Sequence, residues 1–284
     1  MLDQSMIQSI SAALAEDAPN GDVTTENLIP ADARAVAKLR AREVGVFSGS
    51  EVIRETFLQL DSNINVQFEC EDGQQFAAGQ TLAVISGNAR AILRGERIAL
   101  NFSQRMCGIA WLTSQYVQQI QGTQARILDT RKTTPGLRSF ERQAVRDGGG
   151  SNHRFSLSDA VLIKDNHLSV LADEHRDLAE ALRQLRDQVG PNMTIEVEVD
   201  RLDQIPAVLS GNADIILLDN FSLADLRQGV QMINGDALVE ASGGITLNTV
   251  RDVAETGVDR ISVGALTHSV RALDLGLDIE IQAI

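Results

Sequence analysis

The first third of the chain alternates between helical and extended patterns of apolar residues. Four stretches carry apolar side chains at helical spacing and predict helices: residues 5–16, 50–60, 89–100 and 102–120. Three shorter runs predict strands: residues 35–41, 64–68 and 81–85. The segment 21–25 predicts a turn. We therefore expect a small N-terminal domain of mixed α and β structure over residues 1–104.

From residue 125 onward, short apolar runs alternate with helical stretches. The runs predict six strands: residues 125–128, 160–163, 194–199, 214–218, 238–241 and 260–263. Helices are expected at residues 137–147, 172–188, 201–209, 222–233 and 246–255. Repeated strand–helix units are typical of a parallel sheet, closed or open. Because six units are present, and a complete barrel has about eight, we expect an incomplete α/β barrel over residues 105–269.

The last segment has the alternation of a strand. Residues 273–281 alternate apolar and acidic side chains, outside the repeat of the barrel. We expect residues 270–284 to pack back on the N-terminal domain. The predicted fold class is thus α/β, with a small domain of mixed α and β structure joined to an incomplete, open α/β barrel.

Polar side chains stand where the six strands end. Arg131 and Lys132 follow the first strand, and Lys164 ends the second. Glu196 and Glu198 lie in the third, where the two-residue period of a strand points them to the same face. The later strands end in or are followed by Asp219, by Ser242, Gly243 and Gly244, and by Gly264. The ends of parallel barrel strands meet at one rim, where active sites are built.

Residues 129–167 form a cationic stretch in an acidic chain. The whole protein has 25 basic and 39 acidic residues and a formal charge of −14, but in this stretch Lys and Arg outnumber Asp and Glu. A pI near 4.7 argues against nucleic-acid binding, which depends on broad neutralisation of phosphates. The stretch instead favours a small anion bound in a focused cleft.

The composition also argues against other classes of protein. Cys70 and Cys107 are the only cysteines and lack the spacing of a disulfide framework or a zinc site. The N-terminal residues lack the basic and apolar regions of a signal peptide, and no run approaches the ~18 apolar residues of a membrane span. We expect a cytoplasmic protein without a membrane partner.

The rim residues suit an anionic substrate, a metal ion and phosphate. Donors for carboxylate or phosphate are Arg131, Lys132, His153, Arg154 and Lys164. Glu198 and Asp219 offer the hard oxygen ligands that Mg²⁺ accepts. Ser242-Gly243-Gly244 and Val263-Gly264-Ala265 predict tight turns that open helices, where backbone N–H groups bind phosphate.

Each of these features alone has a simpler structural explanation. A Gly-Gly pair before a helix is usually only a turn, and a strand-end Glu more often forms an ion pair. His153 could cap a helix or lie in the core, and Arg142 and Arg146 could form a solvated helix face. The coincidence of these residues at successive strand ends favours a site.

The residues then resemble a known family, the quinolinate phosphoribosyltransferases, also called carboxylating nicotinate-nucleotide pyrophosphorylases. The resemblance runs through most of the chain and rests on long motifs in one order. They lie at residues 21–24, 42–46, 95–101, 129–138, 148–154, 163–167, 196–199, 217–220, 240–245 and 262–268. It implies conversion of quinolinate and phosphoribosyl pyrophosphate into nicotinate mononucleotide, pyrophosphate and CO₂, with Mg²⁺. It also implies a small N-terminal α/β sandwich domain on the open barrel of type II phosphoribosyltransferases. The same resemblance implies an obligate homodimer, with assembly into hexamers left open.

The resemblance also implies a role for each motif residue. Quinolinate is expected to contact Arg131, His153, Arg154, Lys164 and, from the partner subunit, Arg97, and Thr130 is expected to bind substrate as well. Lys132, Glu198 and Asp219 are expected to be catalytic and to serve the ribose, the pyrophosphate and Mg²⁺, directly or through water. Phosphate is expected to contact Ser242, Gly243, Gly244, Val263, Gly264, Ala265 and His268.

The chain departs from the family pattern at two places. Asp147 stands where a small or sulfur-containing residue is usual, and Phe155-Ser156 replaces the usual Met-Gly. Neither change removes an expected ligand, so they bear only on local loop packing and on the placing of Arg154.

Three alternative functions share some of these features. The first is a related phosphoribosyltransferase-like protein, either associated with molybdenum uptake or acting on nicotinate. An enzyme specific for nicotinate would need fewer cations, because its substrate has only one carboxylate. A lipoyl- or biotinyl-type carrier would need a modifiable lysine near residues 72–82, but no lysine occurs between Lys38 and Lys132. An aldolase-like barrel would use Lys164 as a Schiff-base nucleophile, which its arginine-rich surroundings disfavour.

Overall fold

The computed structural model describes residues 2–173 and 177–282, which divide into two compact units. The sandwich unit comprises residues 1–114, 132–149 and 265–284, and the barrel unit comprises residues 115–131 and 150–264. The predictions for 172–188 and for the C-terminal segment include residues 174–176 and 283–284, which lie outside the described residues. No helix among the described residues is long and apolar enough to cross a bilayer.

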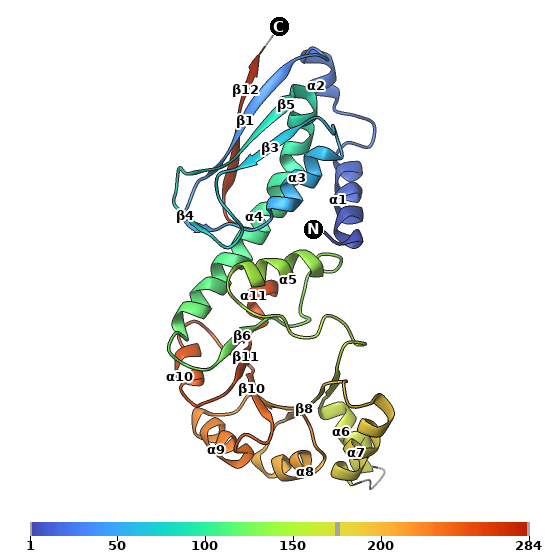
Figure 1. Cartoon of the computed structure of the whole chain (residues 1–284), viewed down its shortest axis with the longest axis vertical. Helices are drawn as coiled ribbons and strands as arrows, with labels where there is room; N and C mark the ends of the chain where they lie inside the picture. Colours follow the sequence, from blue (N-terminus) through green and yellow to red (C-terminus); the bar gives the residue numbers. More distant parts are fainter. Residues whose placement is uncertain (1, 174–176, 283–284) are drawn as a thin grey trace. The chain divides into compact units, whose positions relative to one another are not determined.

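The sandwich unit is built on a four-stranded antiparallel sheet (Figure 1). Its strand order is β12 (Leu275–Gln282), β1 (Arg34–Ala41), β5 (Thr81–Asn88) and β3 (Asn65–Phe68). Burial alternates along β1, as the sequence pattern predicts for a half-buried strand. β12 pairs with β1 along its whole length, so the C-terminal segment packs on the N-terminal sheet. A separate two-stranded pair joins β2 (Gly45–Val46) to β4 (Gln75–Phe76).

Helices cover this sheet and extend the sandwich unit. They are α1 (Gln4–Asp17), α2 (Val23–Leu28), α3 (Ser50–Leu58), α4 (Ala89–Gln119), α5 (Arg138–Asp147) and α11 (Ala265–His268). Apolar residues of α3 and α4 share one buried cluster with the sheet. The turn expected at 21–25 is wrong, because Asp22 caps a helix there by accepting from the Thr25 N–H at 2.9 Å.

The two helices expected at 89–100 and 102–120 are one continuous helix, α4. Asn101, at the expected break, is exposed, and an exposed polar residue interrupts neither the backbone hydrogen bonds nor the buried face. Farther along, Gly108 lets the chain before β12 approach: a Cβ there would lie 2.2 Å from the Arg271 carbonyl oxygen.

The barrel unit contains six parallel strands, as the sequence predicts. Their order in the sheet is β6 (Arg126–Leu128), β11 (Arg260–Ser262), β10 (Leu238–Ser242), β9 (Ile215–Asp219), β8 (Ile195–Val199) and β7 (Val161–Ile163). Every neighbouring pair is parallel. Since β6 and β7 are the two ends of this order, the barrel is open between them, and the predicted fold class is confirmed.

Helices follow most of these strands. They are α6 (Asp165–Asp173), α7 (Leu178–Val189), α8 (Ile205–Ser210), α9 (Leu223–Ile233) and α10 (Val250–Ala254), with a 3₁₀ turn at Leu202–Gln204 before α8. The helix expected at 172–188 is wrong at its start, because a separate helix already begins at Asp165, directly after β7. The helix expected at 246–255 is shorter, because the segment after Gly244 does not become helical until Val250.

Candidate active site at the strand ends of the barrel

Predicted site residues of the barrel unit lie at the carboxyl ends of its parallel strands. Thr130, Arg131 and Lys164 follow β6 and β7, and Glu198 is the next-to-last residue of β8. Asp219 and Ser242 end β9 and β10 and are direct neighbours in the sheet register. Val263 and Gly264 follow β11, and the Val263 N–H donates to the Leu128 carbonyl at 2.9 Å. The structure therefore brings these strand ends to one edge.

The buried side chain of Asp129 connects two cationic motifs, residues 129–138 and residues 148–154. Its carboxylate accepts from Asn152 Nδ2 at 2.6 Å and from the His153 backbone N–H at 2.7 Å. The Ser151 N–H donates to the Ile127 carbonyl at 2.8 Å, which fixes residues 151–153 beside β6. Asp129 was not among the predicted site residues, although its place within the first cationic motif marks it.

Arg131 and Arg154 bring two positive charges together at this place. Burial, and then the nearby Arg131 guanidinium, lower the pKa of Arg154. Arg154 Nη1 donates to the Ala160 carbonyl at 2.9 Å, and both arginines are half-buried. Adjacent guanidinium groups repel one another, and an anion bound between them relieves that repulsion.

Lys164 and Glu198 form an ion pair, with Lys164 Nζ 3.0 Å from Glu198 Oε2. The family resemblance assigns Lys164 to quinolinate and Glu198 to the ribose, the pyrophosphate and Mg²⁺. The ion pair therefore joins the cationic and acidic parts of the rim. The Lys164 side chain is 47% exposed, which leaves it accessible to a ligand. Its carboxylate partner also argues against the Schiff-base alternative, because a nucleophilic lysine is usually activated by desolvation or by another cation.

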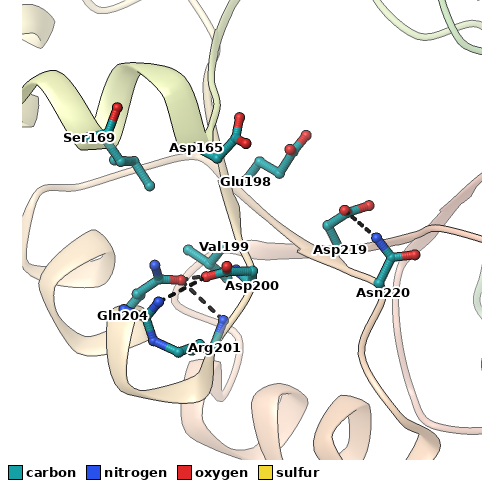
Figure 2. Close-up of a pocket in the computed structure, with 10 residues that line it drawn as sticks. Asp165, Ser169, Glu198, Val199, Asp200, Arg201, Gln204, Asp219 and Asn220 are labelled. Atoms are coloured by element: carbon teal, nitrogen blue, oxygen red, sulfur yellow. Dashed lines mark hydrogen bonds and ion pairs between the residues drawn. The ribbon is translucent and has the colours of Figure 1, made fainter.

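Beside this ion pair lies an acidic cavity of about 580 Å³ (Figure 2). Four of its lining residues carry carboxylates: Asp165, Glu198, Asp200 and Asp219. Asn220 Nδ2 donates to Asp219 Oδ2 at 2.6 Å and steadies that carboxylate. Glu198 and Asp219 thus contribute hard oxygen ligands to a cavity with room for water and phosphate, and this donor set fits Mg²⁺.

The structure also contains a buried cluster in which only His153 was predicted to be a site residue. His153 Nε2 lies 3.1 Å from Glu196 Oε2 and 3.4 Å from Glu240 Oε1. Glu196 is 2% exposed and Glu240 is fully buried. Glu196 was recognised only as sharing a face with Glu198, and Glu240 was not singled out. The available signal was the presence of acidic residues inside strands that are otherwise mostly apolar, two in β8 and one in β10.

The cluster holds protons more tightly than isolated side chains would. Burial acts to lower the pKa of His153, but the two carboxylates outweigh it and raise that pKa to about 10. Burial likewise raises the pKa of Glu196. His153 therefore retains at neutral pH a proton that it would lose in the unfolded chain.

The arrangement of His153 disfavours a metal ion in this cluster, although the three ligand atoms lie within 4.8 Å of one another. The Arg154 backbone nitrogen lies 2.8 Å from His153 Nδ1, so this ring nitrogen faces the backbone. The other ring nitrogen, Nε2, lies 3.1 Å from Glu196 and 3.4 Å from Glu240, and as a proton donor to these carboxylates it cannot bind a metal at the same time.

The two predicted phosphate turns differ in their connection to a helix. Gly243 and Gly244 have positive φ angles of 99° and 60°, and a Cβ on Gly243 would lie 2.1 Å from Asn220 Oδ1. Glycine is thus required at 243 by both conformation and space. The expected helix start after Gly244 is wrong, so this turn offers backbone N–H groups without a helix dipole. After Gly264, α11 begins directly at Ala265.

Four predicted site residues belong to the sandwich unit: Arg97, Lys132, Ala265 and His268. Arg97 is exposed on α4, and Lys132 and His268 are exposed as well. Thr267 Oγ1 donates to the Lys132 carbonyl at 2.8 Å, so the segments that carry Lys132 and His268 are in contact. Ala265 opens α11, which His268 ends.

Comparison with known proteins places these motifs in one family. Residues 22–107 match the N-terminal domain of quinolinate phosphoribosyl transferase, and residues 109–278 match its C-terminal domain. The chain is 42% identical over 280 residues to the nicotinate-nucleotide pyrophosphorylase (carboxylating) of Mycobacterium leprae, covering 95% of this chain and 96% of the relative. It is 39% identical over 284 residues to a mitochondrial quinolinate phosphoribosyltransferase (decarboxylating) of Nicotiana tabacum, covering 94% and 80%.

Solved structures agree with the sequence relatives. The crystal structure of NadC from Streptococcus pyogenes superposes with a TM-score of 0.94 at 36% identity, covering 100% of this chain and 99% of that chain. The nicotinate-nucleotide pyrophosphorylase of Francisella tularensis superposes with a TM-score of 0.91 at 37% identity, covering 99% and 98%.

Proposed function

Since the chain belongs to the quinolinate phosphoribosyltransferase family, we propose that the strand ends of its barrel hold quinolinate and phosphoribosyl pyrophosphate. The enzyme is a decarboxylating phosphoribosyltransferase of de novo NAD biosynthesis. It converts the two substrates into nicotinate mononucleotide, pyrophosphate and CO₂. The observation that carries the site assignment is the junction of cationic and acidic groups at the Lys164–Glu198 ion pair.

The cationic part of the rim is assigned to quinolinate. Arg131, Arg154 and Lys164 offer three positive charges to a dianion, and Thr130 adds a hydroxyl. Both ring nitrogens of His153 face protein groups, so we place this residue beside the dicarboxylate as a support for Arg154. Aligning the dianion in this way presents its ring nitrogen to the ribose, which lowers the entropic part of the barrier.

The acidic and glycine-rich part is assigned to phosphoribosyl pyrophosphate. Glu198 and Asp219 would hold Mg²⁺, which when bound neutralises charge on the departing pyrophosphate. Lys132, which follows Arg131 in the chain, adds a cation for the pyrophosphate. The phosphate contacts are assigned to Ser242, Gly243, Gly244, Val263, Gly264, Ala265 and His268. Carboxylates at this end of the sheet also favour the positive charge that develops on the ribose.

The chemistry proceeds in two steps on these groups. The quinolinate nitrogen forms a bond to the anomeric carbon as the bond to pyrophosphate breaks. The glycosylated ring then carries a positive charge. When the adjacent carboxylate leaves as CO₂, the electron pair stays on the ring carbon, where the positive nitrogen stabilises it until a proton replaces the carboxylate. The substrate is its own electron sink, so the reaction requires no organic cofactor.

The oligomer and the location are also proposed. We assign a homodimer in which Arg97 of each subunit reaches the site of the other. The exposure of Arg97 on α4 supports this role. On the same unit, a groove of about 370 Å³ lined by Ile98, Phe102 and Leu137 offers apolar surface for a partner. A hexamer of such dimers and a cytoplasmic location remain predictions.

The test is a coupled measurement of CO₂ and nicotinate mononucleotide. We expect equimolar release of both from quinolinate, dependent on phosphoribosyl pyrophosphate and Mg²⁺, and no nucleotide from nicotinate. Nicotinate is the control because it lacks the second carboxylate. Turnover of nicotinate at a rate equal to that of quinolinate would favour the related nicotinate-specific activity. Near-normal turnover by both Arg131→Ala and Lys132→Ala would show that the site is elsewhere.

A further inference from the structure

A buried ion pair lies outside the residues assigned to either substrate. Glu141 of α5 is 1% exposed, and its Oε1 accepts from Arg105 Nε of α4 at 2.9 Å. Arg105 Nη2 donates to the same oxygen. Both nitrogens of the guanidinium fork thus converge on one carboxylate oxygen, all within the sandwich unit. A carboxylate so deeply buried requires a fixed partner.

The pair makes further contacts with two segments that carry predicted site residues. Arg105 Nη2 donates to Thr134 Oγ1 at 2.8 Å and to the Thr267 carbonyl at 2.9 Å. Glu141 Oε2 accepts from the Thr134 backbone N–H at 3.2 Å. The first segment begins at Lys132, and the second is α11, which ends at His268. The ion pair is therefore bonded to both segments at once.

The two segments are also bonded to each other. Thr267 is fully buried, and its Oγ1 donates to the Lys132 carbonyl. The path from Glu141 to Lys132 thus consists of Arg105, Thr267 and the Lys132 backbone, each within hydrogen-bond distance of the next. If Arg105 moves, these hydrogen bonds shift the backbone of Lys132 and of α11, and none of them involves the side chains of Arg131, Arg154 or Lys164.

We infer that Arg105 and Glu141 are positioning residues for the phosphoribosyl pyrophosphate half of the reaction. The pair holds the Lys132 segment and α11 in register, so that Lys132 and His268 meet the same substrate. This inference rests on the proposed assignment of Lys132 and His268. It predicts a selective effect, because quinolinate is assigned to cations that this pair does not touch.

The geometry requires arginine at position 105. Two nitrogens of one guanidinium are used: Nε donates to Glu141 alone, while Nη2 lies within hydrogen-bond distance of Glu141, Thr134 and Thr267. The ammonium of a lysine keeps the charge but has no second donor nitrogen, so it cannot hold Glu141 from the Nε position while also reaching Thr134 and Thr267. Arg105→Lys should therefore keep Glu141 paired while releasing Thr134 or Thr267.

The experiment compares Arg105→Lys and Glu141→Gln with wild-type enzyme in steady-state assays that vary each substrate separately. We expect kcat/KM for phosphoribosyl pyrophosphate to fall about 10- to 100-fold in both, as for a displaced substrate-holding group. The KM for quinolinate should stay within about twofold, since its cations keep their places. Glu51→Gln, which disturbs the exposed Arg54–Glu51 pair of the same unit, is the matched control and should leave both constants unchanged.

A purely structural role would give a different result. It would lower the melting temperature of Arg105→Lys and Glu141→Gln while leaving the kinetic constants of the folded fraction unchanged, or it would raise both KM values equally. Either result would overturn the inference. Lys132→Ala and His268→Ala, assayed in parallel, separate this from a failure of the site assignment: if these two retain normal use of phosphoribosyl pyrophosphate, the assignment itself is wrong.

Discussion

The Lys164–Glu198 ion pair joins the two parts of the rim, and its partners are assigned to different substrates. In the free enzyme the ammonium and the carboxylate neutralise each other at 3.0 Å. On the proposed assignment, a bound dianion would compete with Glu198 for Lys164 and would leave the carboxylate available to a metal ion. The order in which the substrates bind would then influence the charge that each of them meets.

Substitution of these two residues should separate the two substrates. We expect Lys164→Ala to raise the KM for quinolinate by on the order of tenfold or more, through loss of a charge-assisted hydrogen bond. Glu198→Gln should instead raise the concentrations of Mg²⁺ and phosphoribosyl pyrophosphate needed for half-maximal rate. Neither should change stability by more than about 1 kcal/mol, because the pair is partly exposed. The reverse pattern of KM changes would contradict the assignment.

The buried cluster of His153, Glu196 and Glu240 should make stability depend on pH. The pKa of His153 is raised to about 10 in the folded protein, above its usual value of about 6.5. Its contribution is therefore fully present below about pH 6.5 and is lost as the pH rises toward 10. We expect the free energy of unfolding, measured by urea titration, to decline across this range.

Glu240→Gln provides the comparison for this pH dependence. The variant removes one of the two carboxylates that raise the pKa of His153, so its stability should decline less steeply between pH 7 and 10. Glu255→Gln, in an exposed ion pair with Arg251 of the same unit, serves as the control and should leave the slope as in wild type. Equal slopes for Glu240→Gln and wild type would mean that Glu240 does not contribute to the raised pKa of His153.

At the scale of elements, the long helix α4 depends on a close approach at Gly108. A methyl group there would meet the Arg271 carbonyl oxygen at 2.2 Å, and that oxygen belongs to the backbone. We expect Gly108→Ala to destabilise the protein by about 1–3 kcal/mol, despite the better helix propensity of alanine. Gln118→Ala, at an exposed position of the same helix, should be nearly neutral in thermal unfolding. A stable Gly108→Ala variant would show that the connection before β12 can move.

The sequence predicted the elements that depend on local pattern. The six barrel strands were predicted because each is an apolar run bounded by polar residues. The ends of these runs gave most of the proposed site, including Arg131, Lys164, Glu198 and Asp219. The sequence did not predict the helix α2, because its six residues are too few to show a helical repeat of apolar side chains. The Asp22 side chain, which caps this helix by accepting from the Thr25 N–H, is also typical of a turn in sequence.

Contacts between distant elements could not be predicted in the same way. Glu196 and Glu240 lie on β8 and β10, which are separated by β9 in the sheet. In a flat sheet strands two apart are about 9–10 Å from each other, so only the curvature of the barrel and the insertion of His153 bring the carboxylates together. The hydrogen bonds of Arg105 likewise join residues far apart in sequence, and no periodicity marks such a pair.

At the scale of the whole molecule, Arg97 is assigned to the site of a partner subunit. Mixing two variants that are each impaired in the use of quinolinate, assayed at a quinolinate concentration far below their KM, tests this assignment. When Arg97→Ala and Lys164→Ala subunits are mixed equally and allowed to exchange, each mixed dimer should contain one intact site. We expect recovery of about a quarter of the wild-type activity, as random pairing in a symmetric dimer predicts. An absence of recovery, with exchange verified by labelled subunits, would contradict a shared site.

Because the protein has a net charge of −14, the place at which it binds the dianion quinolinate is the decisive question for the whole molecule. A dianion must avoid the acidic cavity and reach the cationic part of the rim. The most direct test is a crystal structure of the enzyme with quinolinate and without phosphoribosyl pyrophosphate. We predict both carboxylates within about 3 Å of donors on Arg131, Arg154 and Lys164, with Lys164 turned away from Glu198. Quinolinate bound in the cavity of Glu198 and Asp219, or with its carboxylates away from these cations, would contradict the account.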